Sequence, residues 1–234
     1  MGYQPPSYYA EYPEPQQYYR INLAALSWAE IRRSAGGAWL FFTTAPIVGV
    51  FKLLRAPMVI GEKFPREVSF EALDPAAYER SYHAVEPLFA PLAGLGFEHF
   101  TTFRVPEMPY NSTVFAFMNR REDSYAAVYH VMGPMGDKKG MDFVTRFRDG
   151  SGLTTTNIPD GVALQAPAHH HRFLVAGASA EALWPAHQAE VARLLPSVGG
   201  PRGSVGEEDF IDSWRRSIRD GADFQTARGV FVPV

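Results

Sequence analysis

From Phe97 onward the apolar residues recur with a period of two, and this pattern constrains the fold more than any other feature of the sequence. Alternation over short segments indicates half-buried strands, and the short polar or glycine-containing links between several of them predict antiparallel hairpins. A last strand is expected at about 172–177. The segments with this pattern are FEHFTTFRV (97–105), TVFAFMN (113–119), SYAAVYHVM (124–132), MDFVTRF (141–147) and LTTTN (153–157).

Two segments with helical spacing flank these strands. Asp74-Pro75 is a strong helix start, and the helix is expected to reach Gly94 with kinks at Pro87 and Pro91. A second helix is expected over 180–195, between the capping Ser179 and Pro196, with Pro185 able to delay its start to about Trp184. The sequence therefore predicts an α+β fold: an antiparallel sheet of about five or six strands packed by flanking helices, with N- and C-terminal extensions.

Changes in composition divide the chain into four expected parts. After the core, SVGGPRGS reads as a linker, and Ser204 with Glu207 predicts a capping box for a last amphipathic helix that ends before Gly221. This helix is too short to be stable alone, so we expect it to dock, either on its own domain, which is the default, or on a partner. The parts are a Tyr/Pro-rich arm (1–20), an amphipathic helix and apolar attachment segment (21–65), the α+β core (66–198), and the linker, helix and tail (199–234).

The first twenty residues hold six of the eleven tyrosines and four prolines. Such a segment buries too little surface to offset its ordering entropy, so it is expected to be extended on its own. Tyrosine rings nevertheless suit interfaces, which leaves open a solvated tail or an arm that lies across a partner. The tyrosines are Tyr3, Tyr8, Tyr9, Tyr12, Tyr18 and Tyr19.

Residues 21–60 combine a helix with a long uncharged run. Asn22 is expected to cap a helix that extends to about Ser34, with Arg32 and Arg33 at its end. Residues 34–51 then contain no charge over eighteen positions. As a helix they would span about 27 Å, against roughly 30 Å for the hydrocarbon of a bilayer, while three glycines, Pro46 and two threonines oppose insertion.

Three interpretations of this run stay open: a marginal transmembrane helix, a membrane-surface or re-entrant hairpin, and an apolar segment buried in the protein's own fold or against a neighbouring subunit. Residues 21–60 carry four bases against the one acid Glu30, a net charge of +3 that suits an anionic surface. The residues predicted to attach the chain to a membrane or partner are Trp28, Arg32, Arg33, Trp39, Leu40, Phe41, Phe42, Ile47, Val48, Phe51, Lys52 and Arg55.

Composition excludes several classes of function. The chain has no cysteine, so it has no disulfide, thiol nucleophile, iron–sulfur cluster or cysteine-ligated zinc, and its net charge of −3 argues against a globally basic nucleic-acid-binding protein. The glycine-rich nucleotide-binding motifs, the G-x-S-x-G elbow and the H-E-x-x-H zinc motif are missing from the sequence. No cofactor is expected.

His169-His170-His171 is the most conspicuous cluster of potential ligands. On a strand His169 and His171 would share a face, and His130 is a candidate third ligand for a metal. The alternative is an exposed loop in front of the last strand, and we do not expect a metal site here.

We therefore expect a non-catalytic accessory or structural subunit, attached through its N-terminal region to a membrane surface or a membrane-protein complex. Its expected partners are that surface or complex and other protein subunits, not nucleic acid. Since no secretory signal opens the sequence, the cytoplasmic side is the default location. The alternatives are a carrier or sensor of a small apolar ligand, and an enzyme without a recognisable motif that uses His130, His169 or His171.

Overall fold

The structure is a computed structural model that describes residues 16–234 apart from 36–37, 109–111, 134–135, 159–163 and 204–205. The chain divides into two compact units. The first contains Val68–Pro159 and Ala168–Arg215, and the second contains Glu14–Glu67, Asp160–Pro167 and Arg216–Val234. The long helix α6 (Glu207–Ala227) begins in the first unit and ends in the second. The four-part division expected from composition stays a prediction.

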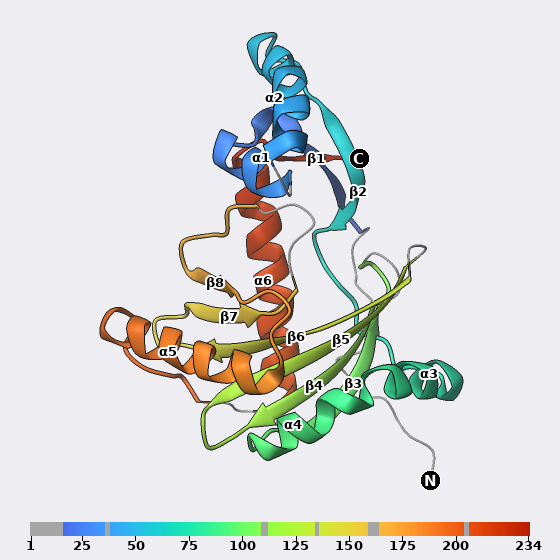
Figure 1. Ribbon diagram of the computed structural model, residues 1–234, viewed down its shortest axis with the longest axis vertical. Coiled ribbons are helices and arrows are strands. Elements are labelled where there is room, and N and C mark those ends of the chain that lie inside the picture. The colour runs from blue at the N-terminus through green and yellow to red at the C-terminus, as the bar shows by residue number, and fades with distance from the viewer. Residues whose placement is uncertain (1–15, 36–37, 109–111, 134–135, 159–163, 204–205) are drawn as a thin grey trace. The chain divides into compact units, whose positions relative to one another are not determined.

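A six-stranded sheet forms the first unit, and it confirms the predicted α+β class (Figure 1). The strand order is β3-β4-β5-β6-β7-β8, and every pairing is antiparallel except the parallel pair β7–β8. The sheet was expected to be antiparallel throughout, and the direction of β8 corrects this expectation: β8 pairs with β7 and runs in the same direction. A long connection between the two strands allows this, whereas a short hairpin link would require antiparallel strands. The strands are β3 (Glu98–Val105), β4 (Ser112–Asn119), β5 (Ser124–Gly133), β6 (Gly136–Arg146), β7 (Gly152–Thr156) and β8 (His170–Leu174), the last of which was expected at 172–177.

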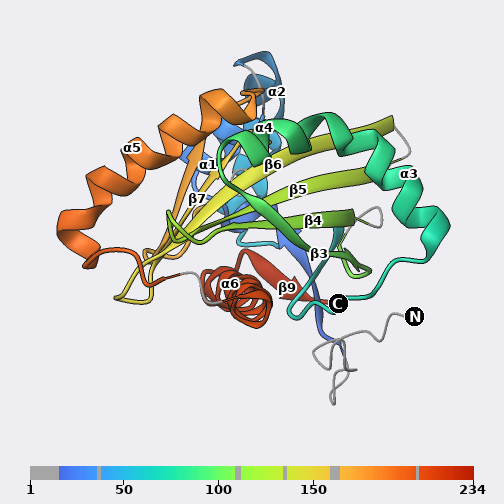
Figure 2. The same cartoon turned by 90° about the horizontal axis from the view of Figure 1, so that it is seen from below.

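Helices α3 (Pro75–Val85), α4 (Phe89–Gly94) and α5 (Ala180–Val198) cover one face of this sheet (Figure 2). The short 3-10 turn η3 (Glu86–Leu88), which contains Pro87, separates α3 from α4, as the prolines predicted. Helix α5 starts at Ala180 and continues through Pro196, so the expected stop there was wrong. It ends instead at Gly199, whose φ of +78° is the left-handed conformation that glycine adopts freely.

The buried core between sheet and helices is rich in aromatic rings. Trp184 of α5 lies edge-on to Phe97, with ring centroids 5.0 Å apart, and Phe143 of β6 contacts both rings. On the opposite face, Phe210 at the start of α6 contacts Phe100 and Tyr125 of the sheet. The first turns of α6 therefore dock on the sheet. The helix continues past Gly221, where it was expected to stop, and Ser204 of the predicted capping box lies outside the described residues.

A three-stranded antiparallel sheet of order β2-β1-β9 organises the second unit. Its strands are β1 (Tyr18–Asn22), β2 (Val59–Pro65) and β9 (Phe231–Pro233). Sequence analysis did not predict these strands, which come from distant parts of the chain. The rings of Tyr19, Phe64 and Phe231 stack in the core of this unit.

The helix expected over 22–34 is divided in two. Asn22 caps only a 3-10 turn, η2 (Leu23–Ala25), and α1 (Trp28–Ser34) has its own cap at Ser27. The break occurs because Ser27 and Glu30 form a complete capping box, a stronger start signal than Asn22 provides for a longer helix. Leu26, between the two helical segments, is fully buried.

Residues 38–53 form a single helix, α2 (Ala38–Leu53), that continues through Pro46. The uncharged run therefore does not adopt the hairpin form of the attachment segment. In the described part of the chain, every helix lacks either the length or the apolar composition that crossing a bilayer requires.

Candidate attachment surface

A narrow stripe of α2 packs against its own unit. Phe41, Ala45, Val48 and Lys52 recur at intervals of four, three and four residues, which places them on one side of a helix. Val48 is only 1% exposed and belongs to the core cluster around Ile21 and Phe231, and Phe41 packs against the edge of that cluster. This stripe holds α2 in place.

The remainder of α2 and the residues just after it form a broad exposed apolar surface. Leu53 is 84% exposed and Phe42 is 69% exposed, values that are unusual for large apolar side chains. A contiguous apolar patch on a protein surface marks an interaction site more often than chance. We call this set the α2 surface; its members are Leu40, Phe42, Ile47, Val50, Leu53, Leu54, Val59 and Ile60, all exposed.

The two threonines of this helix bond to the backbone of the helix itself. The hydroxyls of Thr43 and Thr44 donate to the carbonyl oxygen of Leu40 at 3.0 and 2.7 Å. A threonine that bonds back to the preceding turn exposes no free donor, which lowers the cost of moving it out of water. The two threonines, which argued against insertion in the sequence, are therefore compatible with an apolar environment.

Basic residues flank the α2 surface, and they are not equivalent. Arg32, Arg33 and Arg55 are exposed. Lys52 instead points inward: its ammonium donates to the carbonyl oxygens of Ala24, at 2.7 Å, and of Leu26. Burial lowers the pKa of Lys52, although the nearby Glu30 opposes this shift. Lys52, predicted as an attachment residue, thus serves the internal structure of the second unit.

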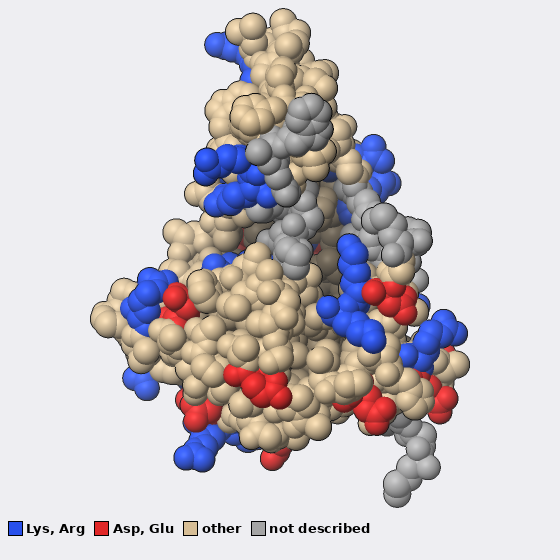
Figure 3. Space-filling model, viewed as in Figure 1, with Lys and Arg blue, Asp and Glu red and all other residues tan. Residues whose placement is uncertain are grey.

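Glu30, the single acid of residues 21–60, is withdrawn from the surface. Its side chain is buried and accepts hydrogen bonds from Ser27, from the Gln165 amide and from Arg228. Burial alone would raise the pKa of Glu30, but the bonds from Arg228, Gln165 and Ser27 outweigh it and lower the pKa to about 2. The described surface over α1 and α2 is accordingly tan and blue on the face that Figure 3 shows.

The other predicted attachment residues take several positions. Trp28 is half exposed, with the Lys52 ammonium 5.4 Å from its ring centroid, and Phe51 is half-buried. The side chain of Trp39 lies outside the described residues, as do Tyr3, Tyr8, Tyr9 and Tyr12 of the predicted arm. Tyr18 and Tyr19 both lie in β1, where Tyr19 is buried and stacked on Phe231.

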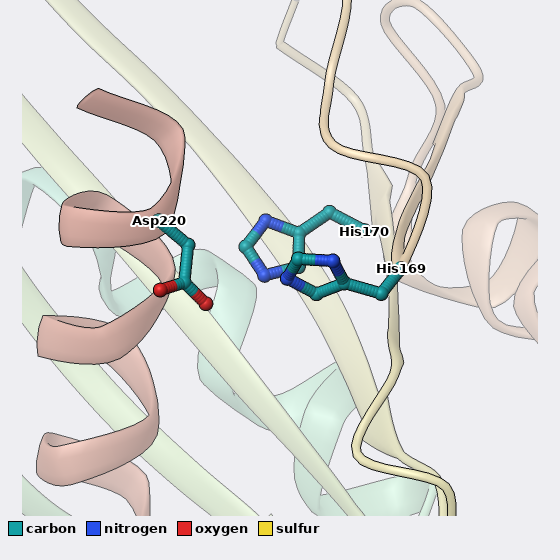
Figure 4. Close-up of side chains that lie close together, drawn as sticks. All are labelled: His169, His170 and Asp220. Carbon is teal, nitrogen blue, oxygen red and sulfur yellow. The ribbon is translucent and has the colours of Figure 1, made fainter. Parts of the chain in front are cut away.

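The histidine cluster lies in the first unit. Figure 4 shows His169 and His170 side by side where the chain enters β8, with ring centroids 4.3 Å apart; Asp220, also drawn there, belongs to the second unit. His171 is half-buried and pairs in register with Leu153. The described contacts within the first unit thus bring together His169 and His170 rather than His169 and His171. Two imidazoles are fewer than the three protein ligands that catalytic zinc sites use.

His130 is fully buried between α3 and the sheet. Its Nδ1 lies 3.1 Å from the Ser81 hydroxyl, which donates in turn to Thr113, and its Nε2 lies 3.2 Å from a carboxylate oxygen of Asp137. Ser81 is equally buried, so the hydroxyl is closed to any substrate in this conformation. His130, Ser81 and Thr113 thus form a buried polar contact, while the side chain of Asp137 is 55% exposed.

Several residues of the α2 surface, and the buried role of Glu30, were not predicted from the sequence. Leu53, Leu54 and Val59 could have been found, because they continue the apolar run on either side of Arg55. The pattern Ser27-x-x-Glu30 could have identified the capping role of Glu30. No local pattern connects Glu30 with Arg228, which lies 198 positions further along the chain.

The chain was compared with known families, curated proteins and solved structures. A scan against models of protein families gave no match, and searches of curated proteins and of solved structures gave none either.

Proposed function

We propose that this protein is a non-catalytic accessory component, held at a membrane surface by the α2 surface, which carries the α+β unit with it. The exposure of large apolar side chains around most of α2 is the observation on which the proposal rests. A helix that is apolar on all sides is normally buried or in contact with lipid, and among the described side chains of α2 the stripe through Phe41 and Val48 packs against the core of its own unit.

Of the two partners expected from the sequence, the lipid surface has the better support. A protein partner usually offers polar groups around an apolar centre. Here the hydroxyls of Thr43 and Thr44 are bonded to their own helix. Exposed arginines precede and follow that helix in the chain: Arg32 and Arg33 in the last turn of α1, and Arg55 just after α2. An apolar face with cations at its border is the composition of an interfacial membrane helix.

Flotation of the purified full-length chain with lipid vesicles tests the proposal. We expect the protein to float with the vesicles, and we expect the double variant Phe42→Ser/Leu53→Ser to stay in the aqueous fraction. In the bound state both large side chains would be partly buried in lipid. Their loss costs about 2–4 kcal/mol of transfer free energy, which corresponds to at least a 30-fold loss of affinity for the vesicles. The thermal midpoint of this variant is expected to stay close to that of the wild type, since both side chains are exposed.

A matched control is available in the first unit. Phe173 and Leu174 of β8 are also exposed large apolar residues, so Phe173→Ser/Leu174→Ser changes the same residue types outside the α2 surface. This control should float like the wild type. A wild-type chain that does not bind lipid vesicles would overturn the proposal. Binding to native membranes but not to lipid vesicles would indicate that the α2 surface binds a membrane protein instead.

A further inference from the structure

Arg55 occupies a backbone position that normally belongs to glycine. Its φ is +52°, one of two positive values among the described non-glycine residues. The Ala56 amide donates to the carbonyl of Phe51, and the Arg55 amide donates to that of Lys52. These two bonds define the Schellman motif that ends a helix, in which the residue at the place of Arg55 must be left-handed.

A left-handed arginine is less stable than glycine would be at the same position, because its Cβ crowds the backbone. Residues held in unfavourable conformations are concentrated at functional sites. Arg55 directly follows Leu53 and Leu54, two of the most exposed members of the α2 surface. Arg55 is itself exposed, so an exposed positive charge directly follows these apolar residues in the chain.

The exposed charge of residues 21–60, around α2, comes from arginine alone. Residues 21–60 contain four bases and one acid, but that acid, Glu30, is buried and paired with Arg228. Of the four bases, Lys52 is turned inward to backbone carbonyls. Three exposed arginines, Arg32, Arg33 and Arg55, remain from this stretch with no exposed acid from the same stretch beside them.

We infer that the α2 surface recognises an anionic lipid surface, and that Arg32, Arg33 and Arg55 provide the selectivity for its negatively charged headgroups. This inference rests on the proposed function and adds the class of lipid. Each basic residue near such a surface contributes attraction that corresponds to about fivefold in affinity, so the three together correspond to roughly 100-fold. Guanidinium groups are suited to the task because they bind phosphate oxygens through two parallel hydrogen bonds.

Binding to vesicles of phosphatidylcholine alone and of phosphatidylcholine with phosphatidylserine tests the inference. We expect tighter binding to the second kind, reduced about fivefold by Arg55→Asn and about 25-fold by Arg32→Gln/Arg33→Gln, and weakened by added salt. Asparagine tolerates the left-handed conformation, so the first variant removes charge without new strain. Arg80→Gln, at an exposed position of α3 in the first unit, makes the same change in net charge and should bind like the wild type.

Arg55→Gly separates a lipid-binding role from a structural one. We expect this variant to raise the thermal midpoint by roughly 2–4 °C, because it relieves the left-handed arginine, and to weaken binding to phosphatidylserine vesicles about fivefold. Equal binding to both kinds of vesicle, abolished by Phe42→Ser/Leu53→Ser, would overturn the inference and leave the proposed function standing. Failure to bind either kind would overturn the proposed function itself.

Discussion

The guanidinium of Arg228 donates two parallel hydrogen bonds to the carboxylate of Glu30, Nη1 to Oε1 at 2.9 Å and Nη2 to Oε2 at 2.7 Å. The pair joins the first turn of α1 to the residue that follows α6, within the second unit. The same carboxylate receives the Gln165 amide at 2.8 Å, so three separate segments meet at one buried group. The position of α1, which supports α2, depends on this contact.

Removal of the arginine is expected to destabilise the second unit strongly. Arg228→Met leaves the buried carboxylate of Glu30 without its main partner, and such a loss costs about 3–5 kcal/mol. Arg66→Met is the matched control, since Arg66 pairs with Asp223 at 3.0 Å with both side chains substantially exposed, and it should cost less than about 1 kcal/mol. Urea unfolding measures both values. Equal costs for the two variants would contradict the role assigned to Glu30.

Acid should weaken the same unit within a defined range. The pKa of Glu30 is lowered from 4.5 to about 2, so the native state holds this proton less tightly than the unfolded chain does. The stabilisation is therefore complete above pH 4.5 and is lost as the pH falls towards 2, by up to about 3 kcal/mol. Glu30→Gln should remove this part of the pH dependence, as followed by unfolding free energies between pH 5 and 2.

His187 predicts a second acid transition, in the first unit and at higher pH. Its ring is buried, with Nε2 2.9 Å from the Thr145 hydroxyl and Nδ1 2.8 Å from that of Thr155. Burial lowers the pKa of His187 from 6.5 to about 3. Between these two pH values the unfolded chain therefore binds a proton that the native state does not bind. Stability should fall by about 1.4 kcal/mol per pH unit as the pH drops from 6.5 towards 3.

The variant His187→Gln isolates this effect. Glutamine cannot take up the proton, so the slope of unfolding free energy between pH 6.5 and 4.5 should flatten in the variant even if its overall stability is lower. An unchanged slope would show that another group titrates in this range.

Substitution of two valines on opposite sides of α2 should affect different properties, stability for the buried one and vesicle binding for the exposed one. Val48 is 1% exposed and Val50 is 54% exposed. Val48→Ser is expected to cost about 2–3 kcal/mol of stability through lost burial, whereas Val50→Ser should change stability by less than about 0.5 kcal/mol and weaken vesicle binding. Chemical denaturation and flotation of both variants give the comparison. A destabilising Val50→Ser would mean that this side of the helix is covered.

The α+β class could be predicted because its signals are local. Alternation in segments such as 97–105 indicates which side chains are buried, and Pro87 limits a helix wherever the helix packs. The parallel pairing of β8 could not be predicted, since it depends on the path of the chain between Thr156 and His170 and not on the residues of the strand.

The second unit was harder to foresee. Its sheet joins β1 to β9 across almost the whole chain, with pairs such as Ile21 with Phe231, and strands of three to seven residues carry little periodicity of their own. That the uncharged run attaches the chain stays a prediction, and its spacing did not predict which side of the helix would be covered, because nearly every position in it is apolar. Only the packing of Val48 and Phe41 in the structure assigns the inner side.

The contact of the α2 surface with lipid can be measured at single positions, because the chain contains no cysteine and accepts one label at a chosen site. Leu53→Cys and, as control, Leu174→Cys each receive an environment-sensitive fluorophore, and quenchers attached to lipid tails are included in phosphatidylserine vesicles. We predict a blue-shifted, quenched signal at position 53 and an unchanged signal at position 174. A label at position 53 that stays in water while vesicles are in excess would contradict attachment through α2.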